Sequence, residues 1–266
     1  MRGTDIFLLK NSSCSPRRAP KGPDKTHIFK NIRLMQKQVI ILFGAPGAGK
    51  GTQATLLSEK LDFFYFETSG IIERIIKDAK EEFIEEDGEK FYFAEQKRLW
   101  ENGKLWDPPF VVHFAKEKIK ELANEGKSIL FAGSPRTIYE AQKELPLLKE
   151  LYGAENIKVF LIEISPQETL HRNSNRKICE LMRHPIIFND ETKNLTLCPL
   201  DGSKLEKREG LDNPETIKVR LEEYKNRTVP IFDIIEKEGI QIKKINGEQS
   251  VAGVYNDILS KISDKD

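Results

Sequence analysis

The chain has 266 residues, 38% of them hydrophobic and 32% charged, which is enough for one large or two small globular domains with a buried core. Its longest apolar runs span about five residues, too short for a membrane helix of about 20. The 43 basic and 42 acidic residues leave a net charge of +1, which excludes strong overall attraction to nucleic acid or anionic lipid. Cys14, Cys179 and Cys198 cannot all pair within one chain, and this favours a cytoplasmic protein in which two thiols bind a metal.

The first 34 residues differ in composition from the rest of the chain. They contain eight basic and only two acidic residues. The stretch 11–23 is rich in Ser, Pro, Arg and Gly and lacks a periodic apolar pattern. We therefore predict a basic, disordered extension over residues 1–34 and a folded domain over 35–266, with Met35 as a candidate start. A basic, Ser-containing targeting leader is the alternative interpretation.

Short apolar runs alternate with longer amphipathic segments from Gln38 onward. Strands are predicted at 39–43, 63–66, 128–132, 158–162 and 240–245. Helices are predicted at 49–61, 69–80, 110–124, 139–152, 167–177, 213–237 and 249–262, with a kink at Pro230. The charged segment 77–90 also favours a helix, without an assigned role. The fold class is therefore α/β, a doubly wound five-stranded parallel sheet flanked by helices.

A glycine-rich loop follows the first predicted strand and opens the next helix. Its sequence, GAPGAGKGT, fits the phosphate-binding pattern G-x-x-x-x-G-K, with Thr52 one place after the usual hydroxyl position. Glycines let backbone N–H groups turn toward phosphate oxygens, the helix N-terminus adds a positive dipole, and Lys50 adds a point charge. The loop predicts a nucleoside triphosphate site formed by Gly44, Ala45, Pro46, Gly47, Ala48, Gly49, Lys50, Gly51 and Thr52.

This loop resembles that of adenylate kinases and related nucleoside monophosphate (NMP) kinases. Further segments resemble that family's motifs in the same order, namely TSGIIER at 68–74, GKLW at 103–106, GSPRT at 133–137 and NG at 246–247. The resemblance covers about residues 38–262. It implies a cytoplasmic, monomeric enzyme that moves the terminal phosphoryl group of MgATP to a nucleoside monophosphate, AMP being the first choice. It implies no nucleic-acid or membrane partner.

The resemblance also implies three parts of a P-loop kinase. The core would consist of 38–68, 106–177 and 207–262, a helical insertion over 69–105 would bind the monophosphate, and a small zinc-type lid over 178–206 would close on ATP. Closure excludes water, so that the phosphoryl group reaches the acceptor and not solvent.

Six arginines accompany these motifs, namely Arg74, Arg136, Arg172, Arg176, Arg208 and Arg220. Phosphoryl transfer requires positioning and neutralisation of several negative charges, for which forked guanidinium groups are suited. The resemblance assigns catalysis to Lys50, Arg136, Arg172, Arg176, Arg208 and Arg220. It adds Arg172, Arg176, Gly247 and Gln249 to the ATP-binding loop. The NMP-binding set is Ser69, Gly70, Arg74, Lys104, Trp106, Gly133, Arg136, Glu140, Arg208 and Arg220.

The segment CPLDG at 198–202 resembles the second half of the zinc knuckle in the lids of some bacterial members. In the first half Met182 occupies the expected position of the second cysteine, and His184 follows two residues later. The predicted tetrahedral zinc site consists of Cys179, His184, Cys198 and Asp201. A metal-free lid with two spare thiols is the alternative.

The sequence departs from the family at Ala132, where the family has an aspartate that organises water on Mg²⁺. Glu163, at the end of the next strand, is a candidate substitute. Because of this departure, three alternative functions stay open. The protein could be a nucleotide-binding protein with little or no turnover, an NMP kinase of altered base specificity, or a P-loop kinase for a small metabolite.

Glu140 is a second departure, four residues after Arg136, where adenylate kinases have glutamine. An amide matches the amino donor and ring-nitrogen acceptor of adenine, whereas a carboxylate matches the two donors of guanine. The sequence therefore predicts weakened discrimination for AMP, with GMP as the beneficiary. If Glu140 pointed to solvent, it would not read the base.

Overall fold

The structure is a computed structural model that describes residues 37–182, 185–207 and 212–263. These residues belong to one compact unit, Gln36–Asp266. The predictions for residues 1–34, for His184 and for Arg208 lie outside the described residues.

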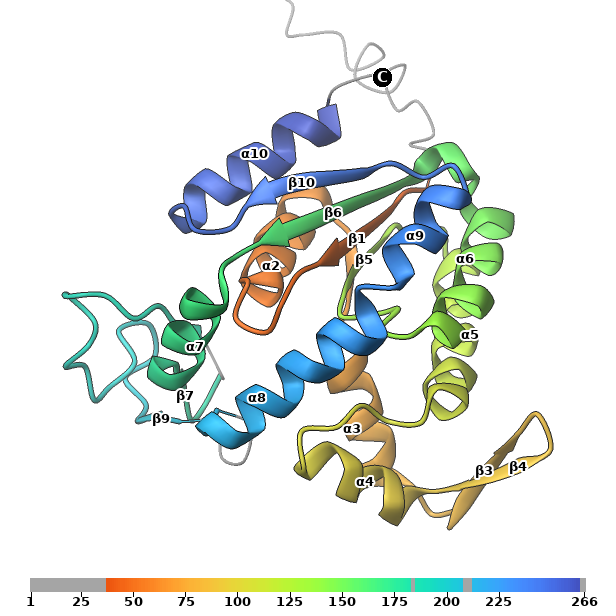
Figure 1. Cartoon of the computed structure of the whole chain (residues 1–266), viewed down its shortest axis with the longest axis horizontal. Coiled ribbons are helices and arrows are strands. Elements are labelled where there is room, and N and C mark those ends of the chain that lie inside the picture. Colours follow the sequence, from red (N-terminus) through yellow and green to blue (C-terminus); the bar gives the residue numbers. More distant parts are fainter. Residues whose placement is uncertain (1–36, 183–184, 208–211, 264–266) are drawn as a thin grey trace, which may run out of the picture. The chain divides into compact units, whose positions relative to one another are not determined.

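The core is a five-stranded parallel sheet with the strand order β10-β6-β1-β5-β2 (Figure 1). The strands are β1 (Val39–Phe43), β2 (Phe64–Phe66), β5 (Ile129–Ala132), β6 (Ile157–Glu163) and β10 (Ile242–Asn246). The central strand, β1, pairs with both β5 and β6, so that Leu42 lies opposite Ala132 on one side and Phe160 on the other. The predicted doubly wound parallel sheet is confirmed.

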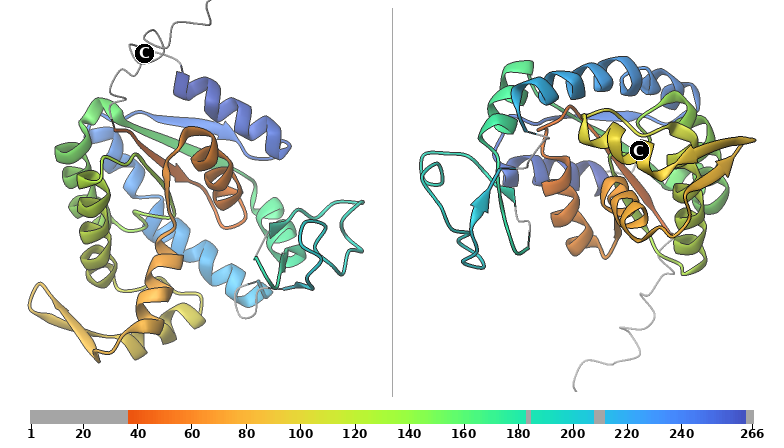
Figure 2. Two further views of the ribbon diagram at one scale, coloured as in Figure 1. Left: turned by 180° about the vertical axis from the view of Figure 1, so that it is seen from behind. Right: turned by 90° about the horizontal axis from the view of Figure 1, so that it is seen from below.

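Helices cover both faces of this sheet (Figures 1 and 2). On one face α2 (Lys50–Leu61) and α10 (Val251–Ser263) pack over a cluster that includes Ile40 and Leu42. On the other, α5 (Pro108–Asn124), α6 (Ile138–Tyr152) and α9 (Ile231–Lys237) pack over Ile41 and Phe43. Because successive residues of β1 enter opposite clusters, the strand is buried on both faces and reads as a continuous apolar run.

Two predicted helices end or break earlier than expected. Helix α7 (Pro166–Asn175) stops at Asn175, because Lys177 already pairs within the lid sheet. The predicted helix 213–237 consists of α8 (Pro214–Glu223), a π-helical turn (η2, Tyr224–Thr228) and α9. Pro230 directly precedes α9, as expected for a residue that has no N–H to continue a helical ladder. A short 3₁₀ turn (η1, Ala154–Asn156) joins α6 to β6.

The region between β2 and α5 contains a hairpin in addition to its helices. Between α3 (Thr68–Asp78) and α4 (Phe93–Glu101), the strands β3 (Phe83–Glu86) and β4 (Glu89–Tyr92) pair antiparallel. The prediction of a helix over 77–90 is therefore wrong. Asp87 and Gly88 adopt φ values of 50° and 81°, which suit a two-residue hairpin turn. Ile84 and Phe91 lie opposite each other and pack into the cluster around Trp106, so tertiary burial outweighed the helical tendency of the charged residues.

The lid consists of three very short strands, β7 (Lys177–Cys179), β8 (Pro185–Ile186) and β9 (Leu205–Glu206), in the order β8-β7-β9. An additional bridge joins Leu197 to Lys204. Large apolar side chains of this segment are exposed, Leu200 to 75% and Leu181 to 69%, so they contribute little to a core. Across the described part of the chain, no helix has the length and apolar character that crossing a membrane requires.

Candidate active site

A cleft of about 1820 Å³ opens at the carboxyl ends of the sheet strands, the edge at which open parallel sheets bind ligands. The structure brings nearly all of the predicted nucleotide-binding residues to this cleft. Among those it describes, only Ala45 and Glu140 do not line it. The residues lining it are Gly44, Pro46, Gly47, Ala48, Gly49, Lys50, Gly51, Thr52, Ser69, Gly70, Arg74, Lys104, Trp106, Gly133, Arg136, Arg172, Arg176, Arg220, Gly247 and Gln249.

The phosphate loop connects β1 to α2 through backbone conformations that require glycine. Gly47 and Gly49 have φ values of 88° and 89°. A Cβ atom on Gly47 would lie 2.6 Å from Nδ2 of the buried Asn173, so the loop has no room for a side chain there. Lys50 begins α2 and folds back under the loop, where its ammonium group donates to the carbonyls of Gly44 (2.7 Å) and Ala45 (3.0 Å).

The ammonium group of Lys50 lies in a positively charged environment. Burial, and to a lesser extent repulsion from three nearby guanidinium groups, together lower the pKa of Lys50 to about 7. These groups belong to Arg136, Arg220 and Arg176. Four cationic side chains from different parts of the chain thus converge on one point, which an anionic ligand would stabilise.

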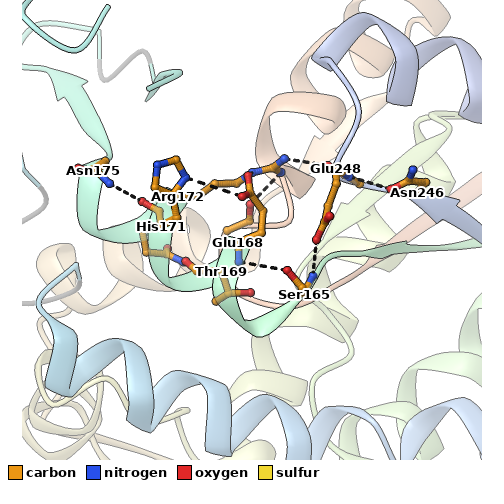
Figure 3. A network of polar contacts seen from close by, with 11 residues as sticks. Ser165, Glu168, Thr169, His171, Arg172, Asn175, Asn246 and Glu248 are labelled. Atoms are coloured by element: carbon orange, nitrogen blue, oxygen red, sulfur yellow. Dashed lines mark hydrogen bonds and ion pairs between the residues drawn. The ribbon is translucent and has the colours of Figure 1, made fainter. Parts of the chain in front are cut away.

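Arg172 links the phosphate loop to the turn after β10 (Figure 3). Its Nη2 donates to the carbonyl of Gly247 at 3.0 Å, and its Nη1 lies 3.5 Å from the carbonyl of Gly47. Glu168, one turn earlier on α7, accepts from Nε of Arg172 at 2.5 Å. Ser165 caps α7 and its N–H donates to Glu248 at 2.7 Å, so the same network holds α7 against the turn that contains Gly247.

Three further arginines that line the cleft are oriented by backbone and carboxylate groups. The Nε of Arg136 donates to the carbonyl of Gly133 at 2.5 Å. Arg220 lies 3.6 Å from the carboxylate of Asp212, which is only 6% exposed. Arg74 on α3 donates from Nε to the carbonyl of Gly70 at 3.1 Å.

Glu140 is buried rather than exposed, so the solvent-facing alternative is wrong. Its carboxylate accepts from the N–H of Arg136 (2.7 Å) and from the hydroxyl of Thr137 (3.0 Å) at the start of α6. Thr137 in turn accepts from the N–H of Glu140, an arrangement similar to a capping box. Glu140 thus stabilises the start of α6, a role that the threonine three residues earlier in the sequence signals.

Glu140 also lines a small cavity of about 10 Å³ beside the cleft, together with Thr68 and Trp106. Nε1 of Trp106 and Oγ1 of Thr68 are buried and have no hydrogen-bond partner among the described residues. Buried polar groups in this condition are uncommon and point to a missing partner such as a ligand.

A second buried carboxylate, Glu144, lies one helical turn after Glu140 and accepts from the hydroxyl of Ser134 at 3.1 Å. Burial raises the pKa of Glu144 well above its usual range, and the neighbouring Glu140 raises it further. Burial also raises the pKa of Glu140. The sequence spacing indicated neither this pair nor its burial.

Glu163 does not replace the carboxylate absent at Ala132. It pairs with Lys244 at 3.1 Å and does not line the cleft, so the candidate drawn from the sequence is wrong. Sequence reasoning missed Tyr65 and Glu67, which do line the cleft at the end of β2. The signal was available, since a polar residue directly after a parallel strand lies at the ligand-binding edge.

The lid brings three of the four predicted metal ligands together. The ligand atoms of Cys179, Cys198 and Asp201 lie within 4.8 Å of one another, and Sγ of Cys179 is 3.1 Å from the Asp201 carboxylate. Both cysteines are buried, and neither forms a disulfide within the described residues. Met182 is 63% exposed, and His184 lies outside the described residues.

Comparison with known proteins identifies the family. The profile of the family described as "Adenylate kinase" matches residues 42–240. An adenylate kinase of Staphylococcus epidermidis is 34% identical over 222 residues, which cover 83% of this chain and 96% of that protein. An adenylate kinase of Staphylococcus aureus (strain Mu50) is 33% identical over 223 residues, with the same coverage. The cleft with its phosphate loop, its converging cationic groups and these similarities agree, and the chain belongs to the adenylate kinase family of nucleoside monophosphate kinases.

Proposed function

We propose that this enzyme moves the terminal phosphoryl group of MgATP to AMP and forms two molecules of ADP. The observation that carries the proposal is the convergence of Lys50 with Arg136, Arg176 and Arg220 in one cleft at the phosphate loop. A transferring phosphoryl group distributes negative charge over its oxygens, and the protein contributes mainly positioning and neutralisation. The alternative function, nucleotide binding without turnover, is not favoured, because this cationic cluster suits phosphoryl transfer as well as nucleotide binding.

We propose that the two substrates occupy opposite sides of the cleft. ATP would lie against the phosphate loop, Arg172, Arg176, Gly247 and Gln249. The monophosphate would lie against Ser69, Gly70, Arg74, Lys104, Trp106, Gly133, Arg136, Glu140 and Arg220. Arg208, outside the described residues, stays a predicted member of the catalytic set.

Magnesium fits this cleft, since the hydroxyl of Thr52 lies beside the phosphate loop and hard oxygen donors suit the ion. When bound with ATP, the ion would neutralise charge on the phosphate oxygens. Lys50 donates to phosphate oxygens in place of the loop carbonyls that it contacts here, and the arginines hold the two nucleotides in line. Closure of the lid then keeps water from competing with the acceptor.

We propose that the lid binds one structural zinc ion through Cys179, Cys198 and Asp201, with His184 as the fourth ligand. Two thiols and a carboxylate are donors that zinc prefers, and tetrahedral zinc places such donors about 3.5 Å apart. The 3.1 Å distance between the Cys179 sulfur and the Asp201 carboxylate is close to that value. A segment whose apolar side chains are largely exposed gains most from a metal cross-link.

AMP is the proposed acceptor, and the wall of the cleft at Trp106, next to the small cavity that Glu140 lines, is the proposed base site. That cavity holds about one water molecule, so it would open to admit the edge of the base. The unpartnered Trp106 Nε1–H and Thr68 hydroxyl can donate to ring nitrogens, while the Glu140 carboxylate can accept from an amino group. Cytoplasmic location and a monomeric state stay predictions of the sequence. The first is supported by Cys179 and Cys198, which form no disulfide within the described residues.

The decisive experiment supplies ATP and Mg²⁺ with AMP, GMP, CMP or UMP and measures diphosphate formation. We expect AMP to give the highest kcat/KM and Lys50→Met to lower it by orders of magnitude at an intact fold. A wild-type protein that binds ATP but forms no diphosphate from any of the four would refute the proposed function.

A further inference from the structure

One carboxylate in the cleft stands apart from the others. Ion pairs hold three of the acidic residues that line it, Glu101 with Lys97, Glu168 with Arg172 and Glu223 with Arg227. Glu73 has an interaction partner as well. Glu67 lines the same cleft, and within the described residues its carboxylate forms no hydrogen bond or ion pair, not even with the helix α3 that it caps. Its Oε2 atom lies 3.1 Å from the position that a Cβ atom on Gly70 would occupy, in the first turn of α3.

Strand pairing places Glu67 next to Ala132. Phe66, the last residue of β2, pairs with Phe131 of β5, so the residues that follow each of them lie at the same level of the sheet edge. Neighbouring strands are about 4.8 Å apart. Ala132 in turn lies opposite Leu42, near the end of the strand that leads into the phosphate loop. Glu67 is therefore one strand away from Ala132 and two from the phosphate loop.

The two residues also lie on the same face. Tyr65 and Ala132 both pack in the cluster under α2, the helix that the phosphate loop opens. Glu67 has extended backbone angles (φ −92°, ψ 95°), so it continues the alternation of β2 and shares the face of Tyr65. The Tyr65 hydroxyl lies 3.4 Å from the position that a Cβ atom on Gly51 would occupy. This face of β2 thus reaches the start of α2.

We propose that Glu67 is the carboxylate that positions Mg²⁺ on ATP through its hydration shell, in place of a carboxylate at position 132. Magnesium in nucleotide sites keeps several waters, so a carboxylate can orient the ion without touching it. The Glu67 side chain would turn from its place beside Gly70 toward Ala132, whose methyl group leaves space for it. Glutamate has one methylene more than aspartate, which helps to span the extra strand. The proposal rests on the proposed function only in that ATP occupies the phosphate loop.

The test measures metal binding, with Mn²⁺ as the probe. Electron paramagnetic resonance titrations give the affinity of the full-length protein–ATP complex for Mn²⁺. Glu67→Gln keeps the shape of the side chain and removes its charge, and we expect it to weaken Mn²⁺ binding about 10-fold or more. Binding of ATP without metal should not weaken, because a negative charge has been removed from the site.

Two further variants make the test specific. Glu163→Gln removes the carboxylate that pairs with Lys244 and should leave Mn²⁺ affinity unchanged. Adding Ala132→Asp to Glu67→Gln should restore the affinity, which shows at the same time that Glu67→Gln is folded. Mn²⁺ affinity of Glu67→Gln within about twofold of wild type, or a loss in Glu163→Gln instead, would overturn the proposal. Because these titrations need no turnover, a protein that makes no diphosphate but shows the Glu67 effect refutes only the proposed function.

Discussion

The lowered pKa of Lys50 predicts that binding of MgATP takes up a proton. Burial and three guanidinium groups lower this pKa to about 7 in the nucleotide-free protein. At pH 8 only about one tenth of the molecules then carry a charged Lys50. Phosphate oxygens favour the charged form and should raise the pKa far above 8, so binding should take up about 0.9 proton per site. At pH 6 Lys50 is already charged, and its share of the uptake falls to about 0.1.

Isothermal titration calorimetry at pH 8 in Tris and in Hepes measures this number directly. The two buffers release different heats when they give up a proton, so the difference in apparent binding enthalpy reports protons taken up. Lys50→Met is the matched control, since it keeps a long unbranched side chain that cannot titrate. The reasoning would be refuted if wild type took up fewer than about 0.2 proton at pH 8, or if Lys50→Met took up as many as wild type.

Three further predictions concern the buried carboxylates and the lid. The raised pKa of Glu144 means that the folded state holds a proton which the unfolded state has released, so stability falls as pH rises through the window above the usual carboxyl pKa. Glu144→Gln should therefore gain melting temperature relative to wild type between pH 5 and pH 9, and a constant difference would contradict this. If Glu140 contacts the base, Glu140→Gln should raise the ratio of kcat/KM for AMP to kcat/KM for GMP by about 5- to 150-fold. An unchanged ratio would show that Glu140 does not read the base and only stabilises the start of α6. Elemental analysis should find about one zinc per chain, lost in Cys198→Ser, and a wild-type protein without metal would refute the lid site.

The parallel sheet and the phosphate loop were predictable because both have local signatures. Val39–Phe43 is a continuous apolar run, which a strand buried on both faces requires. The glycines after it are dictated by backbone geometry, since Gly47 and Gly49 have positive φ and Gly47 faces Asn173. Such requirements act on neighbouring residues and therefore remain visible in the sequence.

Pairings between distant segments were not predictable, and they decided the rest of the site. The charged residues of 77–90 read as a helix, but burial of Ile84 and Phe91 around Trp106 made them a hairpin. Glu163 is the last residue of β6, yet its carboxylate pairs with Lys244. Strand pairing instead brings Glu67 beside Ala132. The sequence by itself determined the fold class, the phosphate loop and the cationic residues. Only the tertiary structure decided which carboxylates face the cleft and which are buried, because side-chain neighbours across a sheet depend on strand order and register.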